Sequence, residues 1–246
     1  MKRRIFVASS MAAALAGCAK ATNSLNEWQA IRPALDSAET LDHALIGTRG
    51  SAKLYAPSDI TQDFPVNGLA TPTQSEYLAY LQDDFASYRL PVSGLVERPQ
   101  SFTLAQLRAL ASLDQITRHD CVEGWSVVGR WAGVPLGSFL QLVRPKPAAR
   151  YVVFNSFDHD QDGTQFYGTL DLVQSAHPQT QLALDLNGKP LDAAHGAPVR
   201  LRIPTQLGYK STKWVKSIQL VASFDHIFGG QGGYWEDNGY AWYAGI

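Results

Sequence analysis

One stretch of this sequence decides how the rest is interpreted: Arg118-His119-Asp120-Cys121-Val122-Glu123-Gly124-Trp125-Ser126. We predict a strand at Gln115–Thr117 just before it, and Gly124 favours a turn after it. A cysteine between the end of a strand and a turn can direct its thiol into a cleft. Since the chain has only two cysteines, Cys18 and Cys121, the role of the second needs an explanation.

Three roles for Cys121 compete. A free cysteine most often serves as a small buried core residue. A cysteine nucleophile would need a base, and His119 lies two residues away on the same face of the strand. A thiolate can also bind a soft metal ion, which itself drives loss of the thiol proton. The nonapeptide alone leaves all three roles open.

The first residues have the pattern of an export signal. Basic residues at 2–4 precede an apolar stretch at 5–15 that is too short to cross a bilayer. Leu15-Ala16-Gly17-Cys18 resembles the bacterial lipobox, which predicts cleavage before Cys18 and acylation of that cysteine. The paired arginines also resemble a twin-arginine signal, with an ordinary basic start as the alternative. We therefore expect a periplasmic protein anchored to a bacterial membrane by lipid at Cys18.

The composition excludes several classes of protein. Hydrophobic residues make up 45% of the chain and charged residues 17%, so a sizeable core is available and disorder is not expected. The formal net charge of −1 argues against a nucleic-acid partner, which needs a basic surface. No apolar run is long enough for a membrane-spanning helix. The Cys-x-x-Cys-His motif of c-type haem attachment is missing, and we expect no haem.

We divide the chain into a signal peptide at 1–17, a tether with an N-terminal helical segment at 18–63, and one domain at 64–246. Thr103 and Gln106 form a capping box that predicts a helix to about residue 111. A second helix is predicted to begin at Pro135 and to end at residue 143.

Apolar and alternating stretches predict strands at 90–96, 151–154, 182–186, 199–203 and 215–221, and Asn187-Gly188 predicts a hairpin after the third of them. Strands and short helices interleave here without regular βαβ spacing. The predicted fold class is therefore α+β, with mixed sheets and short helices.

The segment 121–126, Cys-Val-Glu-Gly-Trp-Ser, and the later Trp-Ala-Gly-Val-Pro-Leu at 131–136 resemble the molybdopterin-binding domain of the sulfite oxidase family. They are most similar to the branch of periplasmic protein-methionine-sulfoxide reductases, whose motif has alanine at the position of Gly124. The resemblance runs from about Phe64 to Ile246 and implies the sulfite-oxidase-type fold. It also implies a molybdenum cofactor with a single pterin, in which Cys121 is the one protein ligand of the metal.

The resemblance assigns two further segments to the phosphate of that cofactor. The turn at 195–200 is similar to the phosphate-proximal turn of the family, where the guanidinium of Arg200 would pair with phosphate. The segment 208–214 is similar to a second clamp, in which backbone N–H groups at 211 and 212 would form an anion nest closed by Lys213. The residues that the resemblance places at the cofactor are Asn67, Cys121, Ser156, His195, Arg200, Ser211, Thr212 and Lys213.

The chemistry implied by the resemblance is oxo-transfer, with electrons exchanged with a separate donor or acceptor. Glu123, Trp125 and Tyr209 are candidates for the substrate side of the site, and with Cys121 they form the predicted catalytic set. Glu123 would repel the sulfite dianion, so sulfite oxidation is disfavoured. A neutral S-oxide or N-oxide, free or bound to a protein, fits better as the substrate.

Two rival functions remain at this point. The chain could be a binding lipoprotein that keeps the fold without a cofactor, or a cysteine hydrolase. Neither of them requires Arg200 and Lys213, which is why we favour the oxidoreductase. The series Asp158-His159-Asp160-Gln161-Asp162-Gly163 begins like a calcium loop, but the twelfth position is Thr169 rather than glutamate. We therefore expect an acidic surface loop there.

Overall fold

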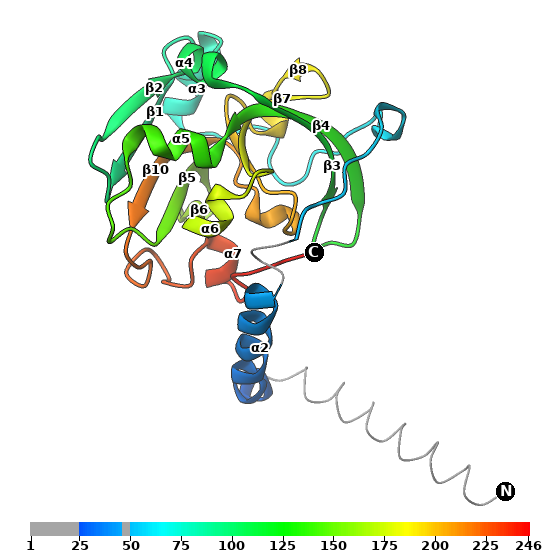
Figure 1. Ribbon diagram of the computed structural model, residues 1–246, viewed down its shortest axis with the longest axis vertical. Coiled ribbons are helices and arrows are strands. Elements are labelled where there is room, and N and C mark those ends of the chain that lie inside the picture. The colour runs from blue at the N-terminus through cyan, green and yellow to red at the C-terminus, as the bar shows by residue number, and fades with distance from the viewer. Residues whose placement is uncertain (1–24, 46–49) are drawn as a thin grey trace, which may run out of the picture.

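The computed structural model describes residues 25–45 and 50–246 (Figure 1). The predicted signal peptide at 1–17 and the predicted lipid anchor at Cys18 lie outside these residues. In the described part of the chain, none of the helices combines the length and apolar character needed to cross a bilayer.

Two five-stranded sheets form the body of the protein (Figure 1). The first contains, in spatial order, β2 (Gln100–Thr103), β1 (Arg89–Gly94), β10 (Val215–Val221), β5 (Tyr151–His159) and β6 (Gln165–Asp171). Its neighbouring strands are antiparallel except for β1 and β10, which are parallel.

The second sheet is antiparallel. It contains β3 (Leu113–Asp120), β4 (Ser126–Pro135), β7 (Gln181–Leu186) and β8 (Lys189–Pro190), and β9 (Arg200–Arg202) also pairs with β7. The two sheets and their interleaved short helices confirm the predicted α+β class.

The helices are α2 (Leu25–Leu45), α3 (Ser75–Gln82), α4 (Leu104–Leu110), α5 (Leu136–Val143), α6 (Leu172–Ala176) and α7 (Tyr234–Asp237). Three short 3-10 turns are η1 (Pro57–Asp59), η2 (Ala193–His195) and η3 (Gly208–Lys210). Helix α2 projects from the body near the C-terminal segment (Figure 1). There the Glu39 carboxylate accepts a hydrogen bond from the backbone N–H of Tyr243 at 2.6 Å.

The core holds large aromatic side chains, and two buried tyrosines among them donate their hydroxyls to backbone carbonyls. Tyr77 and Tyr88 are fully buried. Their hydroxyls donate to the carbonyls of Ala197 at 2.9 Å and Val215 at 2.6 Å. A buried hydroxyl without a partner would be costly, so both hydrogen bonds are needed. They connect α3 and the segment after it to the backbone at Ala197 and Val215, on either side of the predicted cofactor residues 200–213.

Most local predictions are confirmed. The capping box of Thr103 and Gln106 forms with both of its hydrogen bonds and begins α4. Asn187 and Gly188 have φ values of +51° and +77°, as a type I′ hairpin turn requires, and they join β7 to β8. Strand β10 covers the predicted range.

Three local predictions need correction. Strand β5 continues past residue 154 to His159, because the polar side chains beyond that point bond to neighbouring backbone. Helix α5 begins at Leu136, and Pro135 is its N-cap. Asp158 is buried, with 7% of its surface exposed, so the acidic loop reaches the surface only from about residue 160 onward.

Candidate active site

A cavity of about 750 Å³ lies where the end of β3, the segment 64–69, the end of β5 and the segment 208–214 meet. All of the residues predicted for the cofactor and the substrate border it. They are Asn67, Cys121, Glu123, Trp125, Ser156, His195, Arg200, Tyr209, Ser211, Thr212 and Lys213. The structure therefore brings together side chains that are as much as 146 residues apart in the sequence.

Cys121 lies at the wall of the cavity, one residue after β3. Its backbone N–H donates to the carbonyl of Trp125 at 2.9 Å, and its carbonyl accepts from Gly124 at 3.0 Å. Gly124 has a φ of +90°, which explains the glycine in this turn. The side-chain amide of Asn67 donates to the Cys121 sulfur at 3.4 Å. Burial raises the pKa of the thiol, so a bound metal would have to drive its ionisation.

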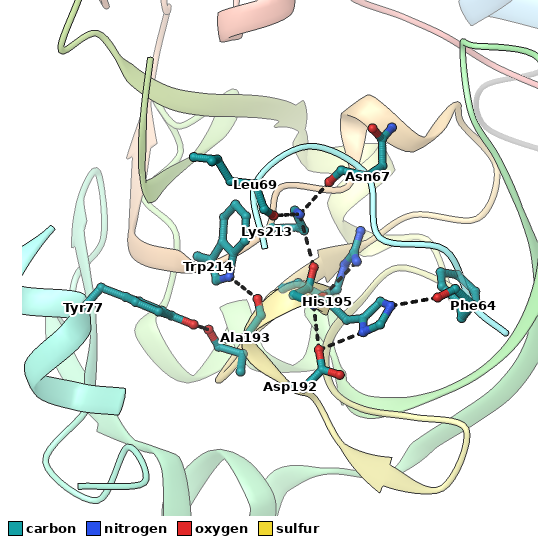
Figure 2. A network of polar contacts seen from close by, with 12 residues as sticks. Phe64, Asn67, Leu69, Tyr77, Asp192, Ala193, His195, Lys213 and Trp214 are labelled. Atoms are coloured by element: carbon teal, nitrogen blue, oxygen red, sulfur yellow. Dashed lines mark hydrogen bonds and ion pairs between the residues drawn. The ribbon is translucent and has the colours of Figure 1, made fainter. Parts of the chain in front are cut away.

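Lys213 joins three segments of the cavity wall (Figure 2). Its ammonium donates to the carbonyls of Asn67 at 2.9 Å, Leu69 at 3.1 Å and Ala194 at 3.3 Å, and it lies 4.0 Å from the ring centroid of Trp214. Burial and the charge of Arg200 lower the pKa of Lys213 to about 7. Lys213 therefore positions the loop that carries Asn67 beside Cys121.

His195 is held in a fixed orientation in the same network (Figure 2). Its Nδ1 lies 2.7 Å from a carboxylate oxygen of Asp192, and its Nε2 lies 3.2 Å from the carbonyl of Phe64. Its own carbonyl accepts from Arg200 at 2.9 Å. The imidazole thus connects η2 to the start of the 64–69 segment and supports the same wall as Lys213.

The floor of the cavity, which consists of Arg200 at the cavity surface and Arg202 behind it, carries positive charge without a matching carboxylate among the described residues. Arg200 and Arg202 are buried, with 6% and 0% of their surfaces exposed. Neither forms an ion pair with a carboxylate within the described ranges. Burial lowers the pKa of Arg200 to about 10 and that of Arg202 to about 9. Buried cations of this kind are costly unless an anion compensates them.

Several buried nitrogen atoms around this floor have no hydrogen-bond partner among the described residues. They are Nε of Arg200, Nε and Nη1 of Arg202, Nδ1 of His119 and Nε1 of Trp131. The guanidinium carbons of the two arginines lie 5.0 and 5.4 Å from the Trp131 ring centroid. Buried polar groups normally have hydrogen-bond partners. This floor therefore suits an anionic ligand that is rich in acceptors.

Two of the groups predicted to contact the cofactor, the Ser156 hydroxyl and the Ser211 N–H, are already engaged with protein. Ser156 donates to the carbonyl of Lys213 at 2.9 Å and accepts from the N–H of Asp158 at 3.0 Å. The N–H of Ser211 donates to the carbonyl of Gly208 at 2.9 Å. Thr212 borders the cavity. In this structure the Ser211 N–H is committed to its own turn, so the predicted anion nest is not open there.

The mouth of the cavity is aromatic and acidic. Trp125 donates through its indole N–H to the Glu123 carboxylate at 2.9 Å, which fixes the indole at the rim. The Tyr209 hydroxyl donates to the carbonyl of Ala241 at 2.7 Å, and its ring meets that of Tyr240 at 5.2 Å. The three predicted substrate-side residues therefore lie at the rim. Trp125 and Glu123 are bonded to each other, and Tyr209 is bonded to the backbone.

Sequence reasoning missed parts of the site. Arg202 lies in β9 two residues after Arg200, and two arginines on one face of an apolar strand were the available signal. Phe166, Tyr234 and Trp235 complete the aromatic mouth. They come from β6 and α7, so no local pattern linked them to Cys121.

His119, the base of the hydrolase alternative, is 8% exposed and borders the cavity. Burial and the charges of Arg202 and Arg200 hold its pKa well below the usual value. Its Nδ1 has no partner among the described residues, whereas the Cys121 sulfur accepts from Asn67. The raised pKa of the thiol and the absence, among the described residues, of a hydrogen bond between the imidazole and the sulfur both oppose a cysteine nucleophile.

Comparisons with known proteins agree with this geometry. Residues 77–226 match the oxidoreductase molybdopterin binding domain. A putative protein-methionine-sulfoxide reductase subunit of Azospira oryzae is 38% identical, over 99% of this chain and 87% of that protein. The catalytic subunit of the protein-methionine-sulfoxide reductase of Xanthomonas axonopodis pv. citri is 32% identical, over 89% of this chain and 70% of that protein.

Among solved structures, the sulfane dehydrogenase SoxCD of Paracoccus pantotrophus has the same fold, with a TM-score of 0.50 and 23% identity. The match covers 56% of this chain and 39% of that one. A cofactor that carries phosphate fits the site found here, because the cavity floor holds buried cations and unpartnered donors. The chain therefore belongs to the oxidoreductase molybdopterin-binding domain family, within the sulfite oxidase superfamily.

Proposed function

We propose that this protein is an exported, lipid-anchored reductase that removes oxygen from a neutral S-oxide or N-oxide. The names of its relatives point to protein-bound methionine sulfoxide as the first substrate to test. The observation that carries the proposal is the cavity itself. It places a single thiol, Cys121, beside a buried cationic floor whose charge no carboxylate of the described residues neutralises.

In this proposal Cys121 holds the molybdenum, and Arg200 contacts the phosphate of the pterin. When bound, the cofactor supplies two-electron oxo-transfer, so that an S-oxide, two electrons and two protons give a sulfide and water. The Asn67 amide donates to the sulfur of Cys121 and thereby favours its thiolate form. Lys213 and His195 hold the surrounding wall in place, as described above.

The mouth selects the substrate in this account. Glu123 is exposed at the rim, and Asp160 and Asp162 border the same opening. Their negative charge opposes entry of a dianion such as sulfite. The aromatic rings between them suit an apolar group that carries a neutral oxide, and a methionine sulfoxide side chain is of that kind.

The remaining parts of the proposal concern the setting of the enzyme. Residues 1–17 direct export, residues 18–63 tether the domain at 64–246, and acylated Cys18 anchors the chain to a periplasmic membrane surface. A separate electron donor completes the reaction, as the word "subunit" in the relatives' names suggests. That the chain itself carries no haem and binds no nucleic acid stays a prediction.

The test uses the full chain from a host that makes the pterin. With a reduced viologen dye as electron donor, we expect reduction of free and protein-bound methionine sulfoxide and no oxidation of sulfite. The Cys121→Ser variant should be inactive, whereas Cys18→Ser should remain active and lose only the lipid anchor. Full activity of the Cys121→Ser variant would refute the proposal.

A further inference from the structure

The pairing of two buried arginines in one short strand goes beyond the predicted cofactor residues. Arg200 and Arg202 occupy alternate positions of β9 and therefore extend to the same face. Arg200 borders the cavity, whereas Arg202 lies behind it, since the lining includes the first and not the second. Both guanidinium groups lie near the Trp131 ring, at 5.0 and 5.4 Å from its centroid, and after burial the positive charge of Arg200 lowers the pKa of Arg202 further.

Arg202 has only part of its hydrogen-bonding capacity satisfied. Its Nη2 donates to the Thr117 hydroxyl at 3.1 Å and to the carbonyl of Arg118 at 2.6 Å. Its Nε and Nη1 have no hydrogen-bond partner within residues 25–45 and 50–246. The carboxylate of Asp120 opposes the fall in the pKa of Arg202, but it already binds Arg118 at 2.8 Å and Ser126 at 2.6 Å.

A purely structural role does not account for this arrangement. A link from β9 to Thr117 could be made by a neutral donor, without the cost of an uncompensated buried charge. The neighbouring ring nitrogens, Nδ1 of His119 and Nε1 of Trp131, also have no hydrogen-bond partner in the described part of the chain. The excess of donors and of positive charge belongs to one place in the fold, directly behind the residue predicted to hold phosphate.

We propose that Arg202 is a further affinity-determining residue for an anionic phosphate ester, supplying the second positive charge behind Arg200. One charge from each arginine matches the two negative charges of the phosphate dianion. The inference rests on the proposed function, in which that ester is the phosphate of the pterin cofactor. The apoprotein carries the cost of the unneutralised pair, and the bound anion removes it.

The proposal predicts opposite effects of one substitution in the two forms of the protein. Arg202→Met keeps most of the volume and removes the charge. Compared with wild type, its apoprotein, made in a host without pterin synthesis, should have an equal or higher Tm. Its loaded form should have a lower Tm, and should retain the cofactor at least about tenfold more weakly, a difference of about 1.4 kcal/mol.

Thr117→Val is the matched control, because it removes one of the two hydrogen bonds from Arg202 to β3 and leaves the charge in place. It should lower the Tm of the apo and loaded forms by the same amount. Arg202→Lys, which restores the charge without the fork of donors, should recover part of the cofactor retention. An Arg202→Met variant that loses stability equally in both forms and keeps wild-type molybdenum content would overturn the proposal.

A second arm separates the cofactor from free phosphate and from failure of the proposed function. Inorganic phosphate is added to the apoproteins and compared with chloride at equal ionic strength. If Arg200 and Arg202 bind the phosphate group, phosphate should raise the Tm of wild type more than that of Arg202→Met. If phosphate raised the Tm of wild type and of Arg202→Met equally, the proposed role of Arg202 in binding phosphate would be contradicted. Wild type that loads no molybdenum, yet shows this phosphate effect, would refute the enzyme function and leave the anion site standing.

Discussion

Replacing Glu236 by glutamine should strongly lower the free energy of unfolding, because this buried carboxylate neutralises a buried lysine near the cavity. Lys210 and Glu236 form a buried ion pair, with 1% and 3% of their side chains exposed. Glutamine keeps the shape and removes the charge, so it leaves the Lys210 ammonium buried without a counter-ion. The ammonium would keep the amide oxygen of the glutamine as an acceptor and the Trp242 ring, 5.4 Å away, but neither of them carries a full compensating charge. Breaking a buried pair in this way costs about 3–5 kcal/mol.

That cost is large compared with the total stability of a domain, about 5–15 kcal/mol. For a chain of this length each kcal/mol shifts Tm by about 2–4 °C, so we expect a fall of roughly 6–20 °C. Lys210 ends the turn η3 inside the predicted clamp at 208–214, directly before Ser211, and Glu236 belongs to α7, whose Tyr234 and Trp235 border the cavity. The substitution should therefore also weaken retention of the cofactor.

The assay is urea unfolding of the apoprotein, with the double variant Lys210→Met, Glu236→Leu as the control. Replacing both charges by apolar groups should recover most of the lost stability, because such exchanges of buried pairs are often neutral or stabilising. A loss below about 1 kcal/mol for Glu236→Gln, or a double variant that loses the sum of the two single effects, would refute the reasoning.

Three further predictions concern single residues. The pKa of Lys213 is about 7 in the folded apoprotein, compared with an ordinary value of 10.5 for the unfolded chain. Between these two pH values the unfolded state therefore binds more protons than the folded state. Wild-type apoprotein should therefore gain stability relative to Lys213→Met as pH rises from 7 to about 10, and equal pH profiles in urea would contradict this. Gly208→Ala would place a Cβ 2.5 Å from Nε2 of His119 and should cost about 1–3 kcal/mol, with an unchanged Tm as the contrary result. Tyr88→Phe leaves the carbonyl of Val215 without its donor and should cost about 1–3 kcal/mol in urea unfolding, whereas a neutral effect would show that the hydroxyl is dispensable.

The parts of the fold that sequence reasoning predicted depend on neighbouring residues. The side chains of Thr103 and Gln106 each accept a hydrogen bond from the other residue's backbone N–H. The turn at Asn187-Gly188 is set by the backbone conformation of these two residues. Such features follow from local chemistry. The continuation of β5 to His159 did not, because Ser156 is satisfied by Lys213, 57 residues away.

The same distinction holds for the site. The motif around Cys121 and the phosphate-related segments were recognisable because each is a continuous stretch. The carbonyl contacts of Lys213 join segments 144 and 146 residues apart in sequence, and the burial of Arg202 depends on β3, β4 and β9 together. No local sequence pattern predicts the carbonyl contacts of Lys213 or the burial of Arg202.

The central claim is that the cavity holds a molybdenum cofactor through Cys121. The most direct measurement is the molybdenum and phosphate content of the purified full chain, wild type and Cys121→Ser, from a host that makes the pterin. We predict about one molybdenum per wild-type chain and at least a tenfold loss in Cys121→Ser, a difference of about 1.4 kcal/mol. Wild-type protein without molybdenum, or a serine variant that retains as much as wild type, would contradict the account.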